Sequence, residues 1–251
     1  MIVIKSALRL GFTALLLTGI AAAPSRAEEA FNESQKAAME TIIHDYIIAH
    51  PEVLLESVNG FQAKQAANEE KAGQEQVAAN KDFLHDSSSP FAGNKKGKTI
   101  IVEFFDYNCG YCKMALKDVV KLIDEDKDVK VIFKELPIFG DDSAKLAKWA
   151  LAAHKQGKYF EFHKALMENP GHISVDSLPD VAQKVGLNVE KMKKDAEDPA
   201  LVEVLKKNHE KAGEMKISGT PAFIIGDKLI KGYVELDGMK KMIEEQRTTK
   251  K

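Results

Sequence analysis

Cysteine is nearly absent from this sequence, and charge of neither sign dominates it. Only two of the 251 residues are cysteines, and the formal net charge at pH 7 is −2. The two cysteines lie three positions apart and close a loop too short to restrain much of the unfolded chain, which indicates exchange chemistry or a metal rather than a stabilising disulfide. The nearly balanced charge predicts no general affinity for nucleic acid or anionic lipid. An apolar content of 44% is typical of a globular protein, not of a disordered one.

The first 27 residues have the layout of a secretory signal peptide. Lys5 and Arg9 form a short basic start, residues 10–23 form an uncharged apolar run, and Ser25-Arg26-Ala27 offers a cleavage site between small residues. The alternative is an uncleaved anchor, but 14 residues fall short of the roughly 20 that a membrane-spanning helix needs. No later stretch is long and apolar enough to span a membrane. We therefore expect a cleaved signal peptide at 1–27 and a mature chain with 33 basic and 38 acidic side chains.

Residues 28–61 are predicted to hold two short amphipathic helices. Apolar residues recur at three- and four-residue spacing from Met39 to Ile47, and Pro51 ends this first helix. The second helix carries Leu54, Leu55, Val58 and Phe61 on one side. Helices this short are marginal in water, so their apolar faces must pack either on the rest of the chain or on another copy of the same segment. We favour the second alternative and expect a helical oligomerisation region.

Residues 62–86 are predicted to form a helical linker. They are rich in Ala, Gln, Glu and Lys and poor in large apolar residues, which is typical of a solvated helix or a semi-rigid spacer. Residues 86–90 (DSSSP) then break the helix and open a second domain, expected to cover 87–251.

The second domain is predicted to be of the α/β class. Its first elements form a βαβ unit with a parallel strand pair, at 99–105, 113–124 and 129–133. A helical insertion of about four helices is expected at about 142–213. A hairpin around Gly226-Asp227 and a final helix from Leu236 to Gln246 complete the domain.

The sequence Cys109-Gly110-Tyr111-Cys112 lies between the first predicted strand and the predicted helix of the βαβ unit. C-x-x-C alone is a weak signal, but it is strong at the start of a helix that follows a buried strand. Unpaired N–H groups and the helix dipole stabilise a thiolate there, and the thiolate is the reactive form. The second cysteine, one turn further on, is positioned to attack a mixed disulfide formed at the first.

The main alternatives for this pair are a zinc site and an inert disulfide. Zinc needs about four ligands, often from two such cysteine pairs. The sequence has no second pair, and its seven histidines show no clear partner spacing. We therefore predict a redox pair with no metal and no cofactor.

Glu103 interrupts an otherwise apolar strand six residues before Cys109. A buried carboxylate is costly unless it is protonated or paired, so Glu103 is a candidate acceptor for the proton of the second thiol. The alternative is a strand-end residue that faces solvent. Lys134 and Glu135, at the end of the second strand, are candidates for a charge partner.

Thr220-Pro221 opens the later strand of the domain. Proline is tolerated at the first residue of a strand, and the cis isomer is a proline speciality. A cis Pro221 beside the cysteines would leave the backbone of Thr220 free to pair with an extended substrate.

Three sequence segments together resemble the DsbA family of periplasmic thioredoxin-fold proteins. They are Glu103-Phe104-Phe105-Asp106-Tyr107, Cys109-Gly110-Tyr111-Cys112 and Gly219-Thr220-Pro221-Ala222-Phe223. The resemblance covers about 87–251 and implies a thioredoxin fold with a helical insertion. It also implies that Cys109 is the nucleophile, Cys112 the resolving thiol, Glu103 the buried acid and Pro221 the cis proline.

Two features depart from the monomeric DsbA oxidases. Their intervening pair is usually Pro-His and their residue before the cis proline is usually Val, whereas this chain has Gly-Tyr and Thr220, the latter resembling the isomerase DsbC. The N-terminal region resembles that of oligomeric relatives: ScsC proteins, dimeric DsbA-like proteins with combined oxidase and isomerase activity, and outer-membrane-associated antigens.

We therefore expect a periplasmic homo-oligomer, with a dimer favoured, that acts as a disulfide isomerase, an oxidase or both on exported proteins. Its expected partners are those substrates and a DsbB-like or DsbD-like membrane redox protein, with no nucleic acid. Association with the outer membrane is a further prediction from the resemblance. The alternatives outside enzymes are a periplasmic chaperone and a copper-binding thiol protein.

Overall fold

The computed structural model describes residues 31–249. The predicted signal peptide and the first residues of the predicted oligomerisation region lie outside this range. The chain divides into two compact units, Met1–Asn59 and Gly60–Lys251. Within 31–249, no helix combines the length and the apolar character needed to cross a membrane.

The first unit contains helix α1 (Glu33–Ala49) and the start of α2 (Glu52–Ala79). Asn32 caps α1 through a reciprocal pair of hydrogen bonds with Gln35. No residue of α1 is buried, and large apolar side chains of both helices are exposed, among them Ile42 and Leu55, each 66% accessible. Within the described part of this unit, these apolar side chains are therefore uncovered.

Helix α2 differs from the prediction in length. The sequence predicted a short helix that ends near Phe61 and then a separate helical linker, but one helix runs from Glu52 to Ala79. The pair Asn59-Gly60, which commonly marks a helix end, precedes the expected junction, but the helix continues through it into the Ala-, Gln- and Glu-rich segment that follows. The predicted solvated character fails at the C-terminal end, because Val77, together with Phe83 and Leu84 in α3 (Lys81–Leu84), is buried against the sheet.

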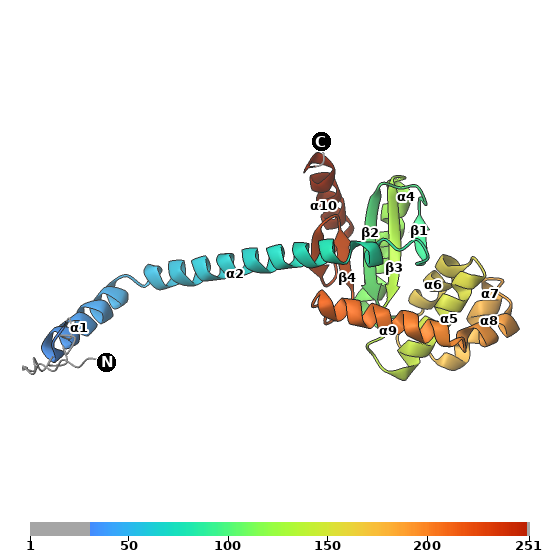
Figure 1. The fold of residues 1–251 in the computed structure, drawn as a ribbon, viewed down its shortest axis with the longest axis horizontal. Helices are drawn as coiled ribbons and strands as arrows, with labels where there is room; N and C mark the ends of the chain where they lie inside the picture. The colour runs from blue at the N-terminus through green and yellow to red at the C-terminus, as the bar shows by residue number, and fades with distance from the viewer. Residues whose placement is uncertain (1–30, 250–251) are drawn as a thin grey trace, which may run out of the picture. The chain divides into compact units, whose positions relative to one another are not determined.

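A five-stranded mixed sheet forms the centre of the second unit (Figure 1), in the order β1-β3-β2-β4-β5. The strands are β1 (Phe91–Gly93), β2 (Thr99–Phe105), β3 (Val129–Glu135), β4 (Ala222–Ile225) and β5 (Lys228–Lys231). β2 and β3 are parallel, as expected for the βαβ unit, and β4 and β5 form the expected hairpin. No strand was predicted at β1, because its three residues give too short a pattern to identify.

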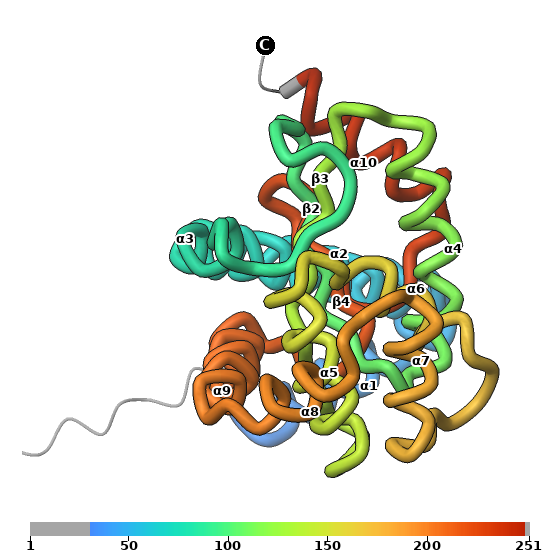
Figure 2. Tube along the Cα trace, turned by 90° about the vertical axis from the view of Figure 1, so that its right-hand side faces the viewer, coloured from blue at the N-terminus to red at the C-terminus, as the bar shows by residue number. Residues whose placement is uncertain are grey.

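The two faces of the sheet carry two hydrophobic clusters. One face packs on α4 (Gly110–Glu125) and α10 (Leu236–Thr249), and its cluster includes Ile101 and Phe105 of β2. The other face, with Val102 and Phe104, packs on the end of α2 and on α3. Figure 2 shows α4 and α3 on opposite sides of the strands. Alternate residues of β2 and β3 therefore point into different surroundings.

The helical insertion follows β3. It contains five α-helices and one 3₁₀ turn: α5 (Asp141–Lys155), α6 (Tyr159–Met167), η1 (Val175–Ser177), α7 (Leu178–Lys184), α8 (Val189–Ala196) and α9 (Pro199–Glu214). Its buried side chains, such as Leu146 and Phe162, join the cluster that also contains both cysteines. The insertion is thus part of the core beside the dithiol.

Candidate active site

Cys109 is the N-cap residue of α4. Its sulfur accepts a hydrogen bond from the backbone N–H of Cys112 at 3.4 Å, and its own N–H donates to the carbonyl of Asp106. Both thiols are free, and both side chains are buried. The first sulfur thus lies where the helix presents unpaired N–H groups, which favour negative charge.

The two thiols differ in acidity. Hydrogen bonding from the Cys112 thiol, helped by the amides of Cys112 and Tyr111, outweighs burial and lowers the pKa of Cys109 to about 6. Burial, with the hydrogen bond to Cys109 and the nearby Glu103 carboxyl, raises the pKa of Cys112 far above the usual thiol range. A thiolate therefore forms at Cys109 near neutral pH while Cys112 keeps its proton.

The segment Thr220-Pro221 lies against Cys109, although 111 positions separate Thr220 from it. The Thr220–Pro221 peptide bond is cis. The Cys109 thiol donates to the Thr220 carbonyl at 3.2 Å. The hydroxyl of Thr220 is buried without a hydrogen-bond partner, and the closeness of this side chain to the sulfur also lowers the pKa of Cys109. The hydroxyl is thus available to the thiolate.

Glu103 lies in the central strand β2 with only 2% of its surface exposed. It does not face solvent, which was the alternative reading of its position. Burial, and to a lesser extent the negative charge at Cys109, raises its pKa to about 8. Glu103 therefore exchanges a proton in the range where Cys109 is already a thiolate.

Glu135 forms a second buried acid on the same face of the sheet. The register pairs Glu103 with Phe133 and Phe105 with Glu135, which directs both carboxyl groups toward the α4 side. Oε1 of Glu135 accepts from Tyr159 at 2.7 Å and from Tyr107 at 3.1 Å, whereas Oε2 is buried without a partner. Burial raises the pKa of Glu135 well above its usual range.

Lys134 points to the opposite face. Its amine donates to the carbonyl of Phe83 at 2.6 Å and to the hydroxyl of Ser89 at 2.8 Å. The suggestion that Lys134 adds a charge partner to Glu103 is therefore wrong, because strand alternation puts the sheet between them. Tyr107, which bonds Glu135, was missed as a site residue; its position two residues before Cys109 was the available signal.

Asp106 fixes the loop beside the dithiol. Its carboxylate accepts from the backbone N–H groups of Ile138 and Phe139, at 2.7 and 3.1 Å. Phe139 is exposed, as is Tyr111 between the two cysteines. Near the thiols, exposed apolar side chains thus lie both on the loop that Asp106 binds, at Phe139, and between the cysteines, at Tyr111.

No cluster of three or more His, Cys, Asp or Glu residues suited to a metal ion occurs within 31–249. The fold and the site together define a thioredoxin-fold protein of the thiol–disulfide oxidoreductase class. Its features are a C-x-x-C pair at a helix N-terminus, an opposing cis proline and a mixed sheet.

The chain belongs to the family described as DSBA-like thioredoxin domain, whose profile matches residues 100–244. Residues 35–68 match a second profile, described as the Copper resistance protein ScsC N-terminal domain. These matches confirm the resemblance to DsbA-family proteins of the ScsC-like type, and with it the thioredoxin-like fold carrying N-terminal helices.

Individual relatives agree with this assignment. The chain is similar to Disulfide bond formation protein D of Bacillus subtilis, with 26% identity over 62% of this chain and 76% of that protein. It is similar to a thioredoxin-like oxidoreductase from Silicibacter pomeroyi, with 37% identity and a TM-score of 0.65 over 67% of this chain and 98% of the other. A structure of ScsC from Proteus mirabilis matches with 30% identity and a TM-score of 0.64 over 87% of this chain and 100% of the other.

Proposed function

We propose that this chain is a periplasmic, homo-oligomeric oxidoreductase that exchanges disulfides with exported proteins through Cys109 and Cys112. The observation that carries the proposal is the unequal placement of the two sulfurs. Cys109 caps α4 beside the cis Thr220–Pro221 bond, whereas Cys112 is completely buried behind it. Glu103, Thr220 and Pro221 complete the proposed catalytic set.

The proposed reaction begins when the Cys109 thiolate attacks one sulfur of a substrate disulfide. A mixed disulfide forms and one substrate thiolate leaves. In the reducing direction, Cys112 passes its proton to the Glu103 carboxylate and attacks the Cys109 sulfur, which releases the second substrate thiolate and leaves the Cys109–Cys112 disulfide. In isomerisation, a substrate thiolate resolves the mixed disulfide instead, and the pair stays reduced. Oxidation of a substrate dithiol is the reverse of the reducing sequence.

Substrate contact is proposed at the Thr220 backbone and at the exposed apolar side chains of Tyr111 and Phe139. An extended peptide can pair with main-chain groups at the cis proline while its side chains lie on the apolar surface. A membrane redox partner of the DsbB or DsbD type would then restore the pair.

Self-association is proposed through α1 and the first turns of α2. The support is the set of exposed apolar side chains there, together with the match of residues 35–68 to the ScsC N-terminal profile. A dimer is the expected state. It would hold two dithiols around one misfolded substrate and favour isomerisation.

Export to the periplasm is proposed because residues 1–27 have the layout of a signal peptide. In support, a similar protein from Salmonella enterica is described as a periplasmic thioredoxin-like protein. Association with the outer membrane stays an untested prediction.

The test compares two assays on the full mature chain: reactivation of scrambled ribonuclease and oxidation of a reduced dithiol peptide. Activity in the first assay with a reducing buffer supports an isomerase, and activity only in the second supports an oxidase. Cys109→Ser should abolish both. Equal activity of Cys109→Ser and the parent would refute the redox proposal.

Copper binding is the second candidate function, because the profile that matches residues 35–68 is described as a domain of a copper resistance protein. Thiolates suit Cu(I). Stoichiometric Cu(I) uptake by the reduced chain, lost in the double serine variant, would favour it. Holdase activity that survives Cys109→Ser would favour the chaperone alternative.

A further inference from the structure

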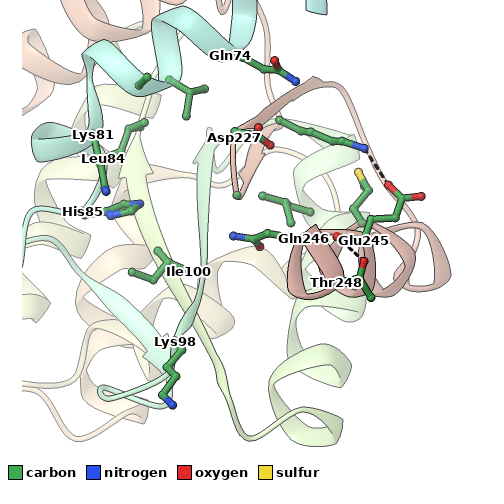
Figure 3. A pocket seen from close by; sticks show the side chains of 16 residues that line it. Gln74, Lys81, Leu84, His85, Lys98, Ile100, Asp227, Glu245, Gln246 and Thr248 are labelled. Carbon is green, nitrogen blue, oxygen red and sulfur yellow. Dashed lines mark hydrogen bonds and ion pairs between the residues drawn. The ribbon is translucent and has the colours of Figure 1, made fainter. Parts of the chain in front are cut away.

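Neither residue between the two cysteines carries a positive charge to accompany a thiolate at Cys109. Two lysines next to the central strands lie in the wrong place for this. Lys134 points to the opposite face of the sheet. Lys98 precedes β2 and lines a cavity there (Figure 3), whereas Cys109 follows the end of that strand. Seven strand residues at roughly 3.3 Å each exceed the screening length of about 10 Å in 0.1 M salt, so Lys98 is too distant.

Lys113 lies one helical turn after Cys109. Its backbone N–H donates to the Cys109 carbonyl at 3.2 Å, and side chains four positions apart are neighbours on a helix. Its amine donates to the backbone carbonyls of Asn169, at 2.8 Å, and of Gly171, in the loop between α6 and η1. Both acceptors are neutral, and no ion pair joins Lys113 to a carboxylate within 31–249. Its charge therefore stays beside α4 without a salt-bridge partner.

The loop that receives this amine, 169–173, is itself fixed. Ile173 is completely buried, and its N–H donates to Oδ1 of Asn108 at 3.1 Å. Asn108 immediately precedes the first cysteine, and Lys113 immediately follows the second. Both residues that flank the C-x-x-C pair thus bind the same loop, which keeps the Lys113 amine from moving away from the dithiol.

The acid that competes for this charge is Asp106. Its carboxylate already accepts four hydrogen bonds, from the hydroxyl of Ser143 and from the backbone N–H groups of Asn108, Ile138 and Phe139. Burial lowers the pKa of Lys113, and the negative charges of Asp106 and Cys109 act in the opposite direction. The interaction with Cys109 is mutual, so an ammonium that is favoured by the thiolate also favours the thiolate.

The other titratable groups around Cys109 do not supply a cation. Cys112 and Glu103 are acids. His172, on the same loop as the carbonyls that bind Lys113, is exposed and pairs instead with Asp142 at 3.5 Å. Lys113 is thus the residue of this group whose positive charge is both held in place and not used in an ion pair.

We propose that Lys113 is a positioning residue for the exchange reaction: its ammonium, held on the carbonyls of Asn169 and Gly171, is the counter-charge of the Cys109 thiolate. This inference rests on the proposed function. When two glutathione thiols reduce the pair, they give two electrons and two protons. The disulfide takes both electrons and one proton, which yields a thiolate at Cys109 and a thiol at Cys112, and the other proton is released. Since the negative charge exists only in the reduced state, a fixed cation stabilises that state and makes the pair more oxidising.

Thiolate absorbance against pH tests this with the reduced full mature chain. The midpoint of Cys109 should rise by about 0.5 pH unit in Lys113→Met, because a partly screened counter-charge is lost. Lys113→Arg, which keeps the charge, should restore the parent midpoint. Lys117→Met, one turn further along α4 and exposed, is the matched control and should titrate like the parent. The difference between parent and Lys113→Met should shrink in 0.5 M salt, which a purely structural defect would not do.

Equilibration with glutathione at pH 8 gives the second measurement. The equilibrium constant for reduction should fall about threefold in Lys113→Met, the same factor as 0.5 pH unit. Lys113→Gln, which keeps a donor for a carbonyl but no charge, should behave like Lys113→Met. The proposal is overturned if Lys113→Met or Lys113→Gln matches the parent, if Lys113→Arg does not restore the midpoint, or if salt leaves the difference unchanged. Loss of both protein-disulfide assays in the parent would instead refute the proposed function, and the comparison of these variants would still decide the role of Lys113.

Discussion

At the scale of single residues, two identical thiols one helical turn apart have opposite acidities. Cys109 receives hydrogen bonds from Cys112 and from the helix amides, whereas Cys112 is surrounded by apolar groups and lies near a carboxyl. The environment, not the residue type, decides which sulfur is a thiolate.

Replacement of Cys112 should therefore change Cys109. In Cys112→Ala the largest stabilising contact of the thiolate is gone, so the pKa of Cys109, about 6 in the parent, should rise by roughly one unit toward that of free cysteine. Ultraviolet absorbance of the thiolate against pH measures this. Cys109→Ala is the control and should show no thiolate at neutral pH. An unchanged midpoint in Cys112→Ala would contradict the assignment.

Glu103 makes stability depend on pH. Its pKa is about 8 in the fold and about 4.5 when unfolded, so between these values the folded state binds the extra proton. This contribution is fully present below pH 4.5 and is lost as pH rises through 8, by up to roughly 1.4 kcal/mol per pH unit.

Glu103→Gln should remove this dependence. Urea unfolding of the reduced protein should show little stabilisation by the substitution at pH 4.5 and about 3 kcal/mol at pH 7. The same variant should resolve the mixed disulfide more slowly. Parallel stability profiles for parent and variant would show that Glu103 does not titrate as described.

At the scale of elements, β3 serves both faces of the sheet. Glu135 enters the core beneath the dithiol. Lys134 points to the other face and binds α3 through the Phe83 carbonyl and the following segment through the Ser89 hydroxyl. The ring of Phe83 lies 4.0 Å from the Lys134 amine. One strand thus anchors α3 and the segment that follows it to the sheet.

Loss of this anchor should loosen residues 83–89. Lys134→Met leaves the Phe83 carbonyl and the Ser89 hydroxyl without their donor, which should cost about 1–3 kcal/mol of stability. Hydrogen exchange should become faster in 83–89 but not in α4. Lys130→Met, on the same strand, is the matched control. Equal exchange in both variants would argue against the anchor.

At the scale of the whole molecule, the described residues of the first unit, 31–59, contain no buried side chain. Large apolar side chains of its two helices are exposed, and leaving them in contact with water is unfavourable. Packing between copies is the physical solution that we propose.

Charges placed on this surface should separate the copies. Ile42→Glu/Leu55→Glu should lower the mass seen by light scattering to that of a monomer, whereas Lys64→Glu, on the polar part of α2, should not. Deletion of 28–61 should also give a monomer, with stronger oxidase and weaker isomerase activity. An unchanged mass in these variants would refute self-association through this region.

Local sequence pattern was sufficient to predict much of the secondary structure of this protein. The βαβ unit, the late hairpin, the helical insertion and the position of Cys109 at a helix start all follow from spacing within short segments, because periodicity and helix capping are local properties. Strand β1 and the continuity of α2 were not predicted. The first is too short to leave a pattern, and in the second the helix continues through Asn59-Gly60, a pair that locally favours a helix end.

The sequence by itself determined that a C-x-x-C pair begins a helix after a buried strand, and that an acid interrupts this strand. Only the tertiary structure decided that Thr220 meets Cys109 and that Glu135 shares the face of Glu103 while Lys134 does not. These facts depend on strand order and register, which join residues from about 30 to more than one hundred positions apart. Such contacts arise from the packing of the whole core, and no short segment encodes them.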